Sequence, residues 1–441
     1  MKKIINTLAL LLILHAAPCL AQDSSTADAA AGACINGSQW FRLYDIYEKD
    51  SASMSPMIRR FSKAMLATAF NRNEEAAEAI TTLVRNHQQE MGMGNVVSML
   101  SLLSTTYSRL GYNTKASATM KSLADQLEGS ADTATVAELR RKQHLYDILG
   151  KSALYQRDKG GNTSHTLPFS TVPFSADSTQ VLIHIGSRLN GQKCTMTFDT
   201  GATYNVITPK LAAKYRLTPT DATISVIGTK LGTGRIAIAK ELTIGTLTLR
   251  NVPFVILDLD SGNERVRHTA DAYSCILGES LLMQFPHYII DFEKSTVTLS
   301  SDTLTTSRRR PNICLTPSGR TPYAEIEYGG RTFAITLDTG AVATTLGNAF
   351  YRDYTADIAR EGKWDIAAST GFGGVTYDSI FRLPSLTMRL SSTPFTLRNV
   401  PVSALSTSNA LSANYGRLGL DFFRLWKKVT INNAAMTIEV E

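Results

Sequence analysis

The feature that most constrains the fold is a repeat in the second half of the sequence. Asp-Thr-Gly-Ala occurs at 199–202 and again at 338–341. Two further motifs recur in the same order after each copy: Thr-Leu-Arg-Asn-Val-Pro at 248–253 and 396–401, and Leu-Gly at 277–278 and 418–419. Ordered markers at near-equal spacing predict two homologous halves, over 172–303 and 312–441, joined by a linker at 304–311.

Both halves carry the pattern of β-strands. Val, Ile, Thr and Phe alternate with polar residues in short runs, and Gly or Pro separates the runs. We therefore expect an all-β part made of two lobes. Arg308-Arg309-Arg310 in the linker is either a processing site or a solvated stretch, and the solvated stretch is favoured.

Residues 22–157 are expected to form a separate helical domain. From 40 to about 155, apolar residues recur at threes and fours, and Pro is rare. Phe-Asn-Arg-Asn-Glu-Glu-Ala at 70–76 is echoed by Leu-Gly-Tyr-Asn-Thr-Lys-Ala at 110–116, which resembles the tetratricopeptide pattern at a longer offset. An ordinary helical bundle is the alternative. Residues 158–171 are predicted to be a linker, because a Gly-rich stretch at 160–164 is followed by Pro168 and Pro173.

The N-terminus is typical of a signal peptide. Lys2 and Lys3 precede a mostly apolar stretch at 4–14, and Cys19-Leu20-Ala21 fits cleavage after Ala21. We predict a signal peptide at 1–21 and an exported protein, periplasmic or secreted. A lipoprotein held through Cys19 is the less favoured alternative. No other segment is apolar enough to be transmembrane.

Composition and cysteine spacing argue against several other classes. The formal charge of +7 is not gathered in a long basic stripe, so nucleic acid is not an expected partner. Five cysteines occur without C-x-x-C spacing, so a zinc or redox motif is not indicated. Four remain after cleavage at Ala21, and buried free thiols or one bridge are favoured over two disulfides. The sequence implies no metal and no organic cofactor.

The residue types of the repeat suggest how each copy is built. An apolar strand leads to the Asp and holds it at the strand end. The Gly permits a tight turn, the Thr hydroxyl can hydrogen-bond to the other half, and the small Ala suits a crowded junction. The residues of the two loops are Thr200, Gly201, Ala202, Thr339, Gly340 and Ala341.

A two-fold arrangement of the halves would bring Asp199 and Asp338 together. Two carboxylates at hydrogen-bond distance cannot both ionise cheaply, so they share a proton. The ionised member can act as general base on a water molecule, and the protonated member can donate to a carbonyl oxygen. Because the titration belongs to the pair, the sequence assigns neither Asp a fixed role.

These motifs resemble the retropepsin-like and pepsin-like aspartic protease family over residues 172–441. The resemblance implies closed, barrel-like lobes with the active site between them, Asp199 and Asp338 as catalytic residues, and a polypeptide substrate. Supporting residues of the apolar segments are Ile276, Leu277, Gly278, Leu418 and Gly419. Arg417 departs from the pattern, because the family carries an apolar residue there. An Arg at this position must reach solvent or a partner.

The family also closes its cleft with a glycine-containing hairpin, the flap. Candidates lie at similar distances after each Asp: Gly228, Gly232 and Gly234, and Gly371, Gly373 and Gly374. Ordinary hairpin turns are the alternative.

The resemblance thus implies an exported aspartic endopeptidase that hydrolyses peptide bonds with water. The alternative is a non-catalytic peptide-binding module on the same fold, with the helical domain as scaffold. One chain supplies both lobes, although pairing with lobes of a second chain is left open. Ala202 and Ala341 lack a hydroxyl that would favour a charged carboxylate, so mildly acidic to near-neutral activity is expected.

The helical domain has no catalytic constellation, so a structural, regulatory or recruiting role is expected, with a protein partner as one outcome. A latent form is a second hypothesis, in which Leu167-Pro168-Phe169 and Val172-Pro173-Phe174 occupy the cleft. The favoured interpretation is that 171–174 begins the outer strand of the first lobe.

Overall fold

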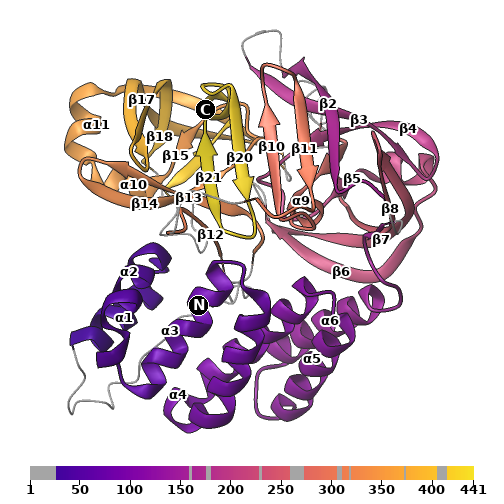
Figure 1. The fold of residues 1–441 in the computed structure, drawn as a ribbon, viewed down its shortest axis with the longest axis vertical. Helices are drawn as coiled ribbons and strands as arrows, with labels where there is room; N and C mark the ends of the chain where they lie inside the picture. The colour runs from indigo at the N-terminus through magenta and orange to yellow at the C-terminus, as the bar shows by residue number, and fades with distance from the viewer. Residues whose placement is uncertain are drawn as a thin grey trace, which may run out of the picture. The chain divides into compact units, whose positions relative to one another are not determined.

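The chain divides into a helical unit that ends at Lys151 and a β-rich unit that begins at Ser152 (Figure 1). The prediction of a helical N-terminal region followed by a two-lobed β-rich region is confirmed. This computed structural model describes residues 26–157, 161–174, 180–227, 231–258, 273–304, 310–316, 319–371, 374–404 and 415–441. The predicted signal peptide lies outside these residues, as do Arg308 and Arg309 of the linker.

The helical unit is a series of helices joined by short turns. They are α1 (Thr26–Asn36), α2 (Trp40–Asp50), the 3₁₀ turn η1 (Ser51–Ser53), α3 (Pro56–Ala69), α4 (Asn73–Arg109), α5 (Asn113–Leu127) and α6 (Thr133–Leu149). α4 is interrupted by non-helical backbone at His87 and Gly92. Among the described residues, no helix combines the length and the apolarity that a membrane span needs.

The sequence echo corresponds to a repeated turn geometry. Asn71 and Gly111 each follow a helix with a positive φ, 55° and 78°. The next N–H then reaches back five residues, from Arg72 to Ala67 O and from Tyr112 to Tyr107 O, both at 2.8 Å, as in a helix C-terminal cap. The tetratricopeptide resemblance itself stays a prediction.

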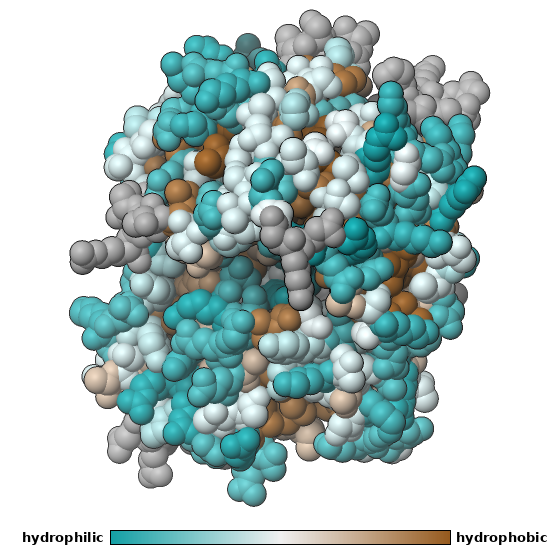
Figure 2. Space-filling model, turned by 45° about the vertical axis from the view of Figure 1, so that its right-hand side comes forward, coloured by the Kyte–Doolittle hydropathy of each residue, from teal (hydrophilic) through white to brown (hydrophobic). Residues whose placement is uncertain are grey.

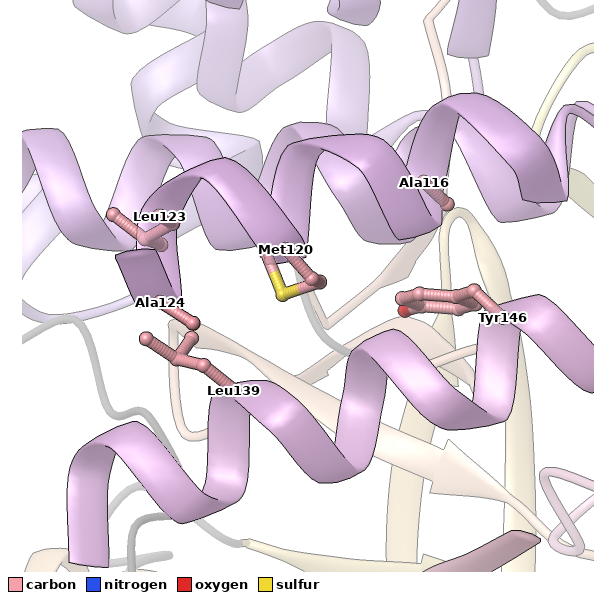
Figure 3. Packing of buried hydrophobic residues seen from close by; sticks show 6 residues of the cluster. All are labelled: Ala116, Met120, Leu123, Ala124, Leu139 and Tyr146. Atoms are coloured by element: carbon pink, nitrogen blue, oxygen red, sulfur yellow. The ribbon is translucent and has the colours of Figure 1, made fainter. Parts of the chain in front are cut away.

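Small residues allow α5 and α6 to pack closely. Ala116 and Ala124 are fully buried beside Met120, and Leu139 and Tyr146 of α6 complete the cluster (Figure 3). Burying a large apolar side chain of this kind stabilises a fold by about 1.5–3 kcal/mol.

Lobe 1 is residues 152–304 and lobe 2 is residues 310–441. The strands of lobe 1 are β1 (Gln156–Arg157), β2 (Ser164–Pro173), β3 (Val181–Leu189), β4 (Gln192–Phe198), β5 (Val206–Ile207), β6 (Pro219–Ile227), β7 (Leu231–Ile244), β8 (Leu247–Ile256), β9 (Cys275–Leu277), β10 (His287–Asp291) and β11 (Thr296–Ser300). Those of lobe 2 are β12 (Ile313–Leu315), β13 (Pro322–Tyr328), β14 (Arg331–Leu337), β15 (Thr345–Leu346), β16 (Lys363–Gly371), β17 (Gly374–Leu390), β18 (Thr393–Ser403), β19 (Gly416–Leu418), β20 (Lys428–Asn432) and β21 (Thr437–Val440).

The two lobes pair their strands in the same order. In lobe 1 the path runs β3-β4-β9-β5-β8-β7, and β7 pairs again with β3. In lobe 2 the path runs β13-β14-β19-β15-β18-β17, and β17 pairs again with β13. Each path therefore closes on itself, and β6 or β16 pairs with its last strand. Short helices complete the lobes: α7 (Pro209–Lys214), α9 (Glu279–Leu282), α10 (Asn348–Asp353), α11 (Thr355–Glu361) and α12 (Leu420–Phe423).

A sheet joins the lobes. The final hairpin of lobe 2, β20–β21, pairs through β20 with β10, and β10 continues to β11 and β2 of lobe 1. Figure 1 shows the yellow β20 and β21 beside β10 and β11. The lobes are thus parts of one hydrogen-bonded unit, which holds their loops in register.

The predicted linker at 158–171 is wrong for its second half, because β2 begins at Ser164. Residues 164–168 pair with β11 and residues 169–173 pair with β3. Each half of β2 therefore has one neighbour, so Pro168 and Pro173 can stand in it without breaking a ladder on both sides. The latent-form hypothesis is also wrong, since these residues form a strand of lobe 1 in this structure.

Lobe 1 begins earlier than expected, at the residues just after the helical unit. Tyr155 N donates to Asn251 O at 3.3 Å, and Asn251 Nδ2 donates to Ala153 O at 3.0 Å. β1 then pairs with β8. A chain that starts near Ser170 would lose β1 and more than half of β2.

The described cysteines are buried and unpaired. Cys34, Cys194, Cys275 and Cys314 are free thiols, the alternative favoured for them over two disulfides. On the face shown in Figure 2, hydrophilic residues predominate and apolar residues appear in small separate patches.

Candidate active site

Both Asp-Thr-Gly loops begin where a buried strand ends. Asp199 follows β4, which runs parallel to β9, and its N–H donates to Leu277 O at 3.0 Å. Asp338 follows β14, which runs parallel to β19, and its N–H donates to Leu418 O at 2.9 Å. The apolar segments singled out in the sequence are thus the strands that fix the two Asp residues.

The two threonines hold the loops together by reciprocal hydrogen bonds. Thr200 Oγ1 donates to Leu337 O at 2.9 Å and accepts from Thr339 N at 3.0 Å. Thr339 Oγ1 donates to Phe198 O at 2.9 Å and accepts from Thr200 N at 3.1 Å. All four bonds are buried and cross between the lobes, as the sequence predicts for these hydroxyls.

The glycines bring each loop against the opposite carboxylate. A Cβ on Gly201 would overlap the carboxylate of Asp338, and a Cβ on Gly340 would overlap that of Asp199. Only Gly permits this approach. The two carboxyl groups are buried and interact by a side-chain hydrogen bond. The structure therefore brings together the two Asp residues that the repeat predicted as a pair.

Burial and mutual repulsion make this pair hard to ionise fully. Burial, together with the charge of Asp338, raises the pKa of Asp199 to about 8. The N–H groups of Gly201 and Ala202, at 2.8 and 3.0 Å from Asp199 Oδ1, oppose this shift. At neutral pH Asp199 therefore keeps a proton within the pair.

Arg417 reaches a partner, as the sequence required. Its Nη1 donates to Asp338 Oδ2 at 3.1 Å, and the pair is an ion pair. The Arg417 side chain is 54% exposed, whereas that of Asp338 is 9% exposed. The guanidinium therefore approaches the carboxylates from the solvent side, and the departure from the apolar pattern belongs to the site itself.

Sequence reasoning missed Tyr273, which lies next to the carboxylates. Its hydroxyl donates to Gly340 O at 2.6 Å, across from lobe 1 to lobe 2. Burial and the charges of Asp199 and Asp338 raise the pKa of Tyr273, so it is a neutral donor. Its position three residues before Ile276 gave no signal, because the matching residue of lobe 2 is Asn414.

A set of polar residues behind each loop was also missed. In lobe 1, Asn205 Oδ1 accepts from Gly278 N at 3.0 Å, and Asn205 N donates to Ser280 Oγ at 3.1 Å. In lobe 2, Thr344 and Asp421 occupy the matching places. Thr344 Oγ1 accepts from Gly419 N at 3.0 Å and donates to Asp421 Oδ1 at 2.7 Å.

These polar residues could have been found from their equal positions in the two halves, although the residue types differ. Asn205 and Thr344 stand at the same place after their Asp, and Ser280 and Asp421 stand at the same place after their Gly. Different residue types do the same work, so a search for repeated letters does not find them.

Each lobe also has a hairpin at the place predicted for a flap. β6 and β7 pair in lobe 1, and β16 and β17 pair in lobe 2. Gly371 and Gly374 are the facing residues at the end of the second hairpin. Gly228 and Gly373 lie outside the described residues. Gly232 and Gly234 lie within β7, and Gly234 is needed for packing, since a Cβ there would overlap Val255 Cγ1.

Other candidate sites are weaker. A cavity of about 740 Å³ in lobe 1 is lined by residues of β3, β4 and α7 and does not include either Asp. Among the described residues, no group of three His, Cys, Asp or Glu is placed to hold a metal ion.

A match to one protein family agrees with the resemblance drawn from the motifs. Residues 185–280, which include Asp199 and its loop, match the family described as "Aspartyl protease". No curated protein matches the chain. Two solved structures are similar in fold. The aspartic proteinase from Irpex lacteus is 14% identical with a TM-score of 0.38, and the match covers 62% of this chain and 96% of that protein. The structure titled edgp is 11% identical with a TM-score of 0.36, and the match covers 63% of this chain and 94% of that protein. The family match supports the aspartic protease resemblance of lobe 1.

Proposed function

We propose that this chain is an exported aspartic endopeptidase, with Asp199 and Asp338 as its catalytic pair. The observation that carries the proposal is the contact of the two buried carboxyl groups. Each is fixed by its own strand and pressed against the glycine of the opposite loop. The match of residues 185–280 to the aspartyl protease family supports the same conclusion. Export rests on the predicted signal peptide at 1–21.

The geometry suits attack by water on a peptide carbonyl. One ionised carboxylate can take a proton from a water molecule, while the protonated carboxyl donates to the carbonyl oxygen. The raised pKa of Asp199 keeps one proton in the pair up to about pH 8. No covalent intermediate with the protein is needed, and the chain's own residues supply the acid and the base.

Cleavage of unfolded polypeptide tests the proposal. The mature chain is incubated with a mixed peptide library, with and without a statine-type inhibitor, and products are identified by mass spectrometry. We expect internal cleavage that the inhibitor suppresses. No cleavage between pH 4 and pH 8 would contradict the proposal.

The second candidate is a module that binds peptides without cutting them. The Arg417–Asp338 ion pair favours this second function, because the guanidinium already occupies one oxygen that the catalytic pair would use. Binding of a denatured protein without any product would support this function. For the helical unit we propose recruitment of a protein partner or substrate. Loss of partner binding on deleting it, with unchanged cleavage of short peptides, is the expected result.

A further inference from the structure

The two carboxyl groups of the pair differ in what else they bind. Ala202 N and Ala341 N each donate to the Oδ1 of their own Asp at 3.0 Å, and Asp199 Oδ1 accepts a further bond from Gly201 N at 2.8 Å. Asp338 has in addition the guanidinium of Arg417 on Oδ2. Among the described residues, a cation therefore makes a hydrogen bond to Asp338 and none makes one to Asp199.

The strand register shows that this difference is a substitution within equivalent frames. Ile276 of β9 stands opposite Thr197, and Arg417 of β19 stands opposite Thr336. Ile276 is 7% exposed and contributes an apolar side chain. At the equivalent position of lobe 2, the half-exposed side chain of Arg417 lies at hydrogen-bond distance from the Asp338 carboxylate.

Within the described part of the chain, the other titratable groups around the pair are two tyrosines and one glutamate. Tyr273 faces both carboxylates, and Tyr323 of β13 interacts with Arg417; each phenol is neutral because burial raises its pKa. Behind Asp199 lies Glu279, whose pKa burial raises and which interacts in turn with Arg320. An opposite charge in contact favours the ionised form of a carboxyl group, and the contact with a cation is on the Asp338 side of the pair.

We propose that Arg417 is a positioning residue that fixes the roles of the two carboxyl groups, with Asp338 as the general base and Asp199 as the general acid. This inference rests on the proposed peptidase function. It also adds to the argument from Ala202 and Ala341, which treated the two carboxyl groups alike in expecting mildly acidic to near-neutral activity. Neither loop has a Ser or Thr hydroxyl at the position of Ala202 or Ala341, but Asp338 has a cation in contact, and among the described residues no cation contacts Asp199.

The assigned roles give a balanced reaction. Water loses a proton to Asp338 as its oxygen bonds to the peptide carbon, and Asp199 gives its proton to the carbonyl oxygen. The carbon–nitrogen bond then breaks as the amine takes the proton from Asp338. A hydroxyl of the intermediate returns a proton to Asp199, and the pair is restored.

The first test is the pH profile of kcat/KM for Arg417→Ile, which gives lobe 2 the residue of lobe 1. Loss of the cation makes both ionisations of the pair harder, so both limbs should move to higher pH, by about one unit for a half-exposed charge. Arg417→Lys, which keeps the charge, should stay near the parent profile. A uniform loss of activity with unmoved limbs would show a merely structural role and overturn the inference.

The second test does not depend on cleavage. In the Asp199→Asn chain with ¹³C-labelled aspartate, the Asp338 carboxyl is titrated by NMR with and without Arg417→Ile. We expect a midpoint higher by about one unit without Arg417. Equal midpoints would overturn the inference even if the chain is a peptidase. Absent cleavage with a shifted midpoint would contradict the function and leave the charge effect of Arg417 established. Arg417→Gln replaces Arg417→Ile if the latter does not fold.

Discussion

Lobe 1 and lobe 2 share a frame but differ in the side chains that touch it. The closed paths of paired strands, the parallel strand beside each Asp and the four threonine bonds are equivalent in the two lobes. At two matching positions the side chains differ in chemistry: Ile276 corresponds to Arg417, and Ser280 corresponds to Asp421. The comparison teaches that the frame sets where the carboxyl groups lie, while single residues on it set how each one ionises.

The largest effect is expected where the lobes are equal. Asp199→Asn and Asp338→Asn should each lower kcat by about 10³-fold or more, because one shared proton requires both carboxyl groups. Circular dichroism should show that both variants are folded. A variant that keeps near-normal turnover as a monomer would remove its Asp from the catalytic pair.

The threonine bonds should also respond equally in both lobes. Thr200→Val and Thr339→Val each leave a buried N–H and a buried C=O without a partner, at a cost of about 2–4 kcal/mol in unfolding free energy. Thr200→Ser keeps the hydroxyl and serves as the matched control. Urea titration of the full chain gives the values, and a loss confined to one lobe would contradict the two-fold frame.

Much of this frame could be predicted from the sequence, because the repeat fixes it. Asp199 and Asp338 stand at strand ends in two copies of one motif, and a two-fold arrangement of the copies follows. The threonine bonds across the junction follow from the same motif. Helical periodicity from 40 to about 155 gave the helical unit in the same way.

The contacts that the sequence does not predict join distant residues. Arg417 could be singled out as a departure from the repeat, but its partner Asp338 lies 79 residues away and could not be named. Tyr273 acts across the lobes on a carbonyl group. Pro168 and Pro173 made β2 look like a linker, because the sequence does not show that each half of this strand pairs on one side only.

A third prediction concerns how Asp199 makes the free energy of unfolding depend on pH. Because the pKa of Asp199 is raised to about 8, the folded chain holds a proton that the unfolded chain releases near pH 4. The free energy of unfolding should therefore fall as pH rises from about 4 to about 8. Asp199→Asn removes this fall, so it should be more stable than the parent chain at pH 8 and similar to it at pH 4. Urea titrations at a series of pH values test this, and a parallel pH dependence in both chains would contradict it.

The smallest effects should come from the polar residues behind the loops, and here the lobes should differ. Thr344→Val removes the acceptor of Gly419 N and a donor to Asp421, whose pKa burial already raises, so about 1–2 kcal/mol of unfolding free energy should be lost. Ser280→Ala removes the bond from Asn205 N and the hydrogen bond with the Tyr155 hydroxyl, but no bond to a buried carboxyl group, and should cost about 1 kcal/mol. Thr344→Ser keeps the hydroxyl and should lie near the parent chain. Because neither change removes a carboxyl group of the pair, kcat/KM should fall by less than in the Asp variants. If Ser280→Ala costs as much as Thr344→Val, the bond to Asp421 adds nothing, and the two lobes are held by their shared strands alone.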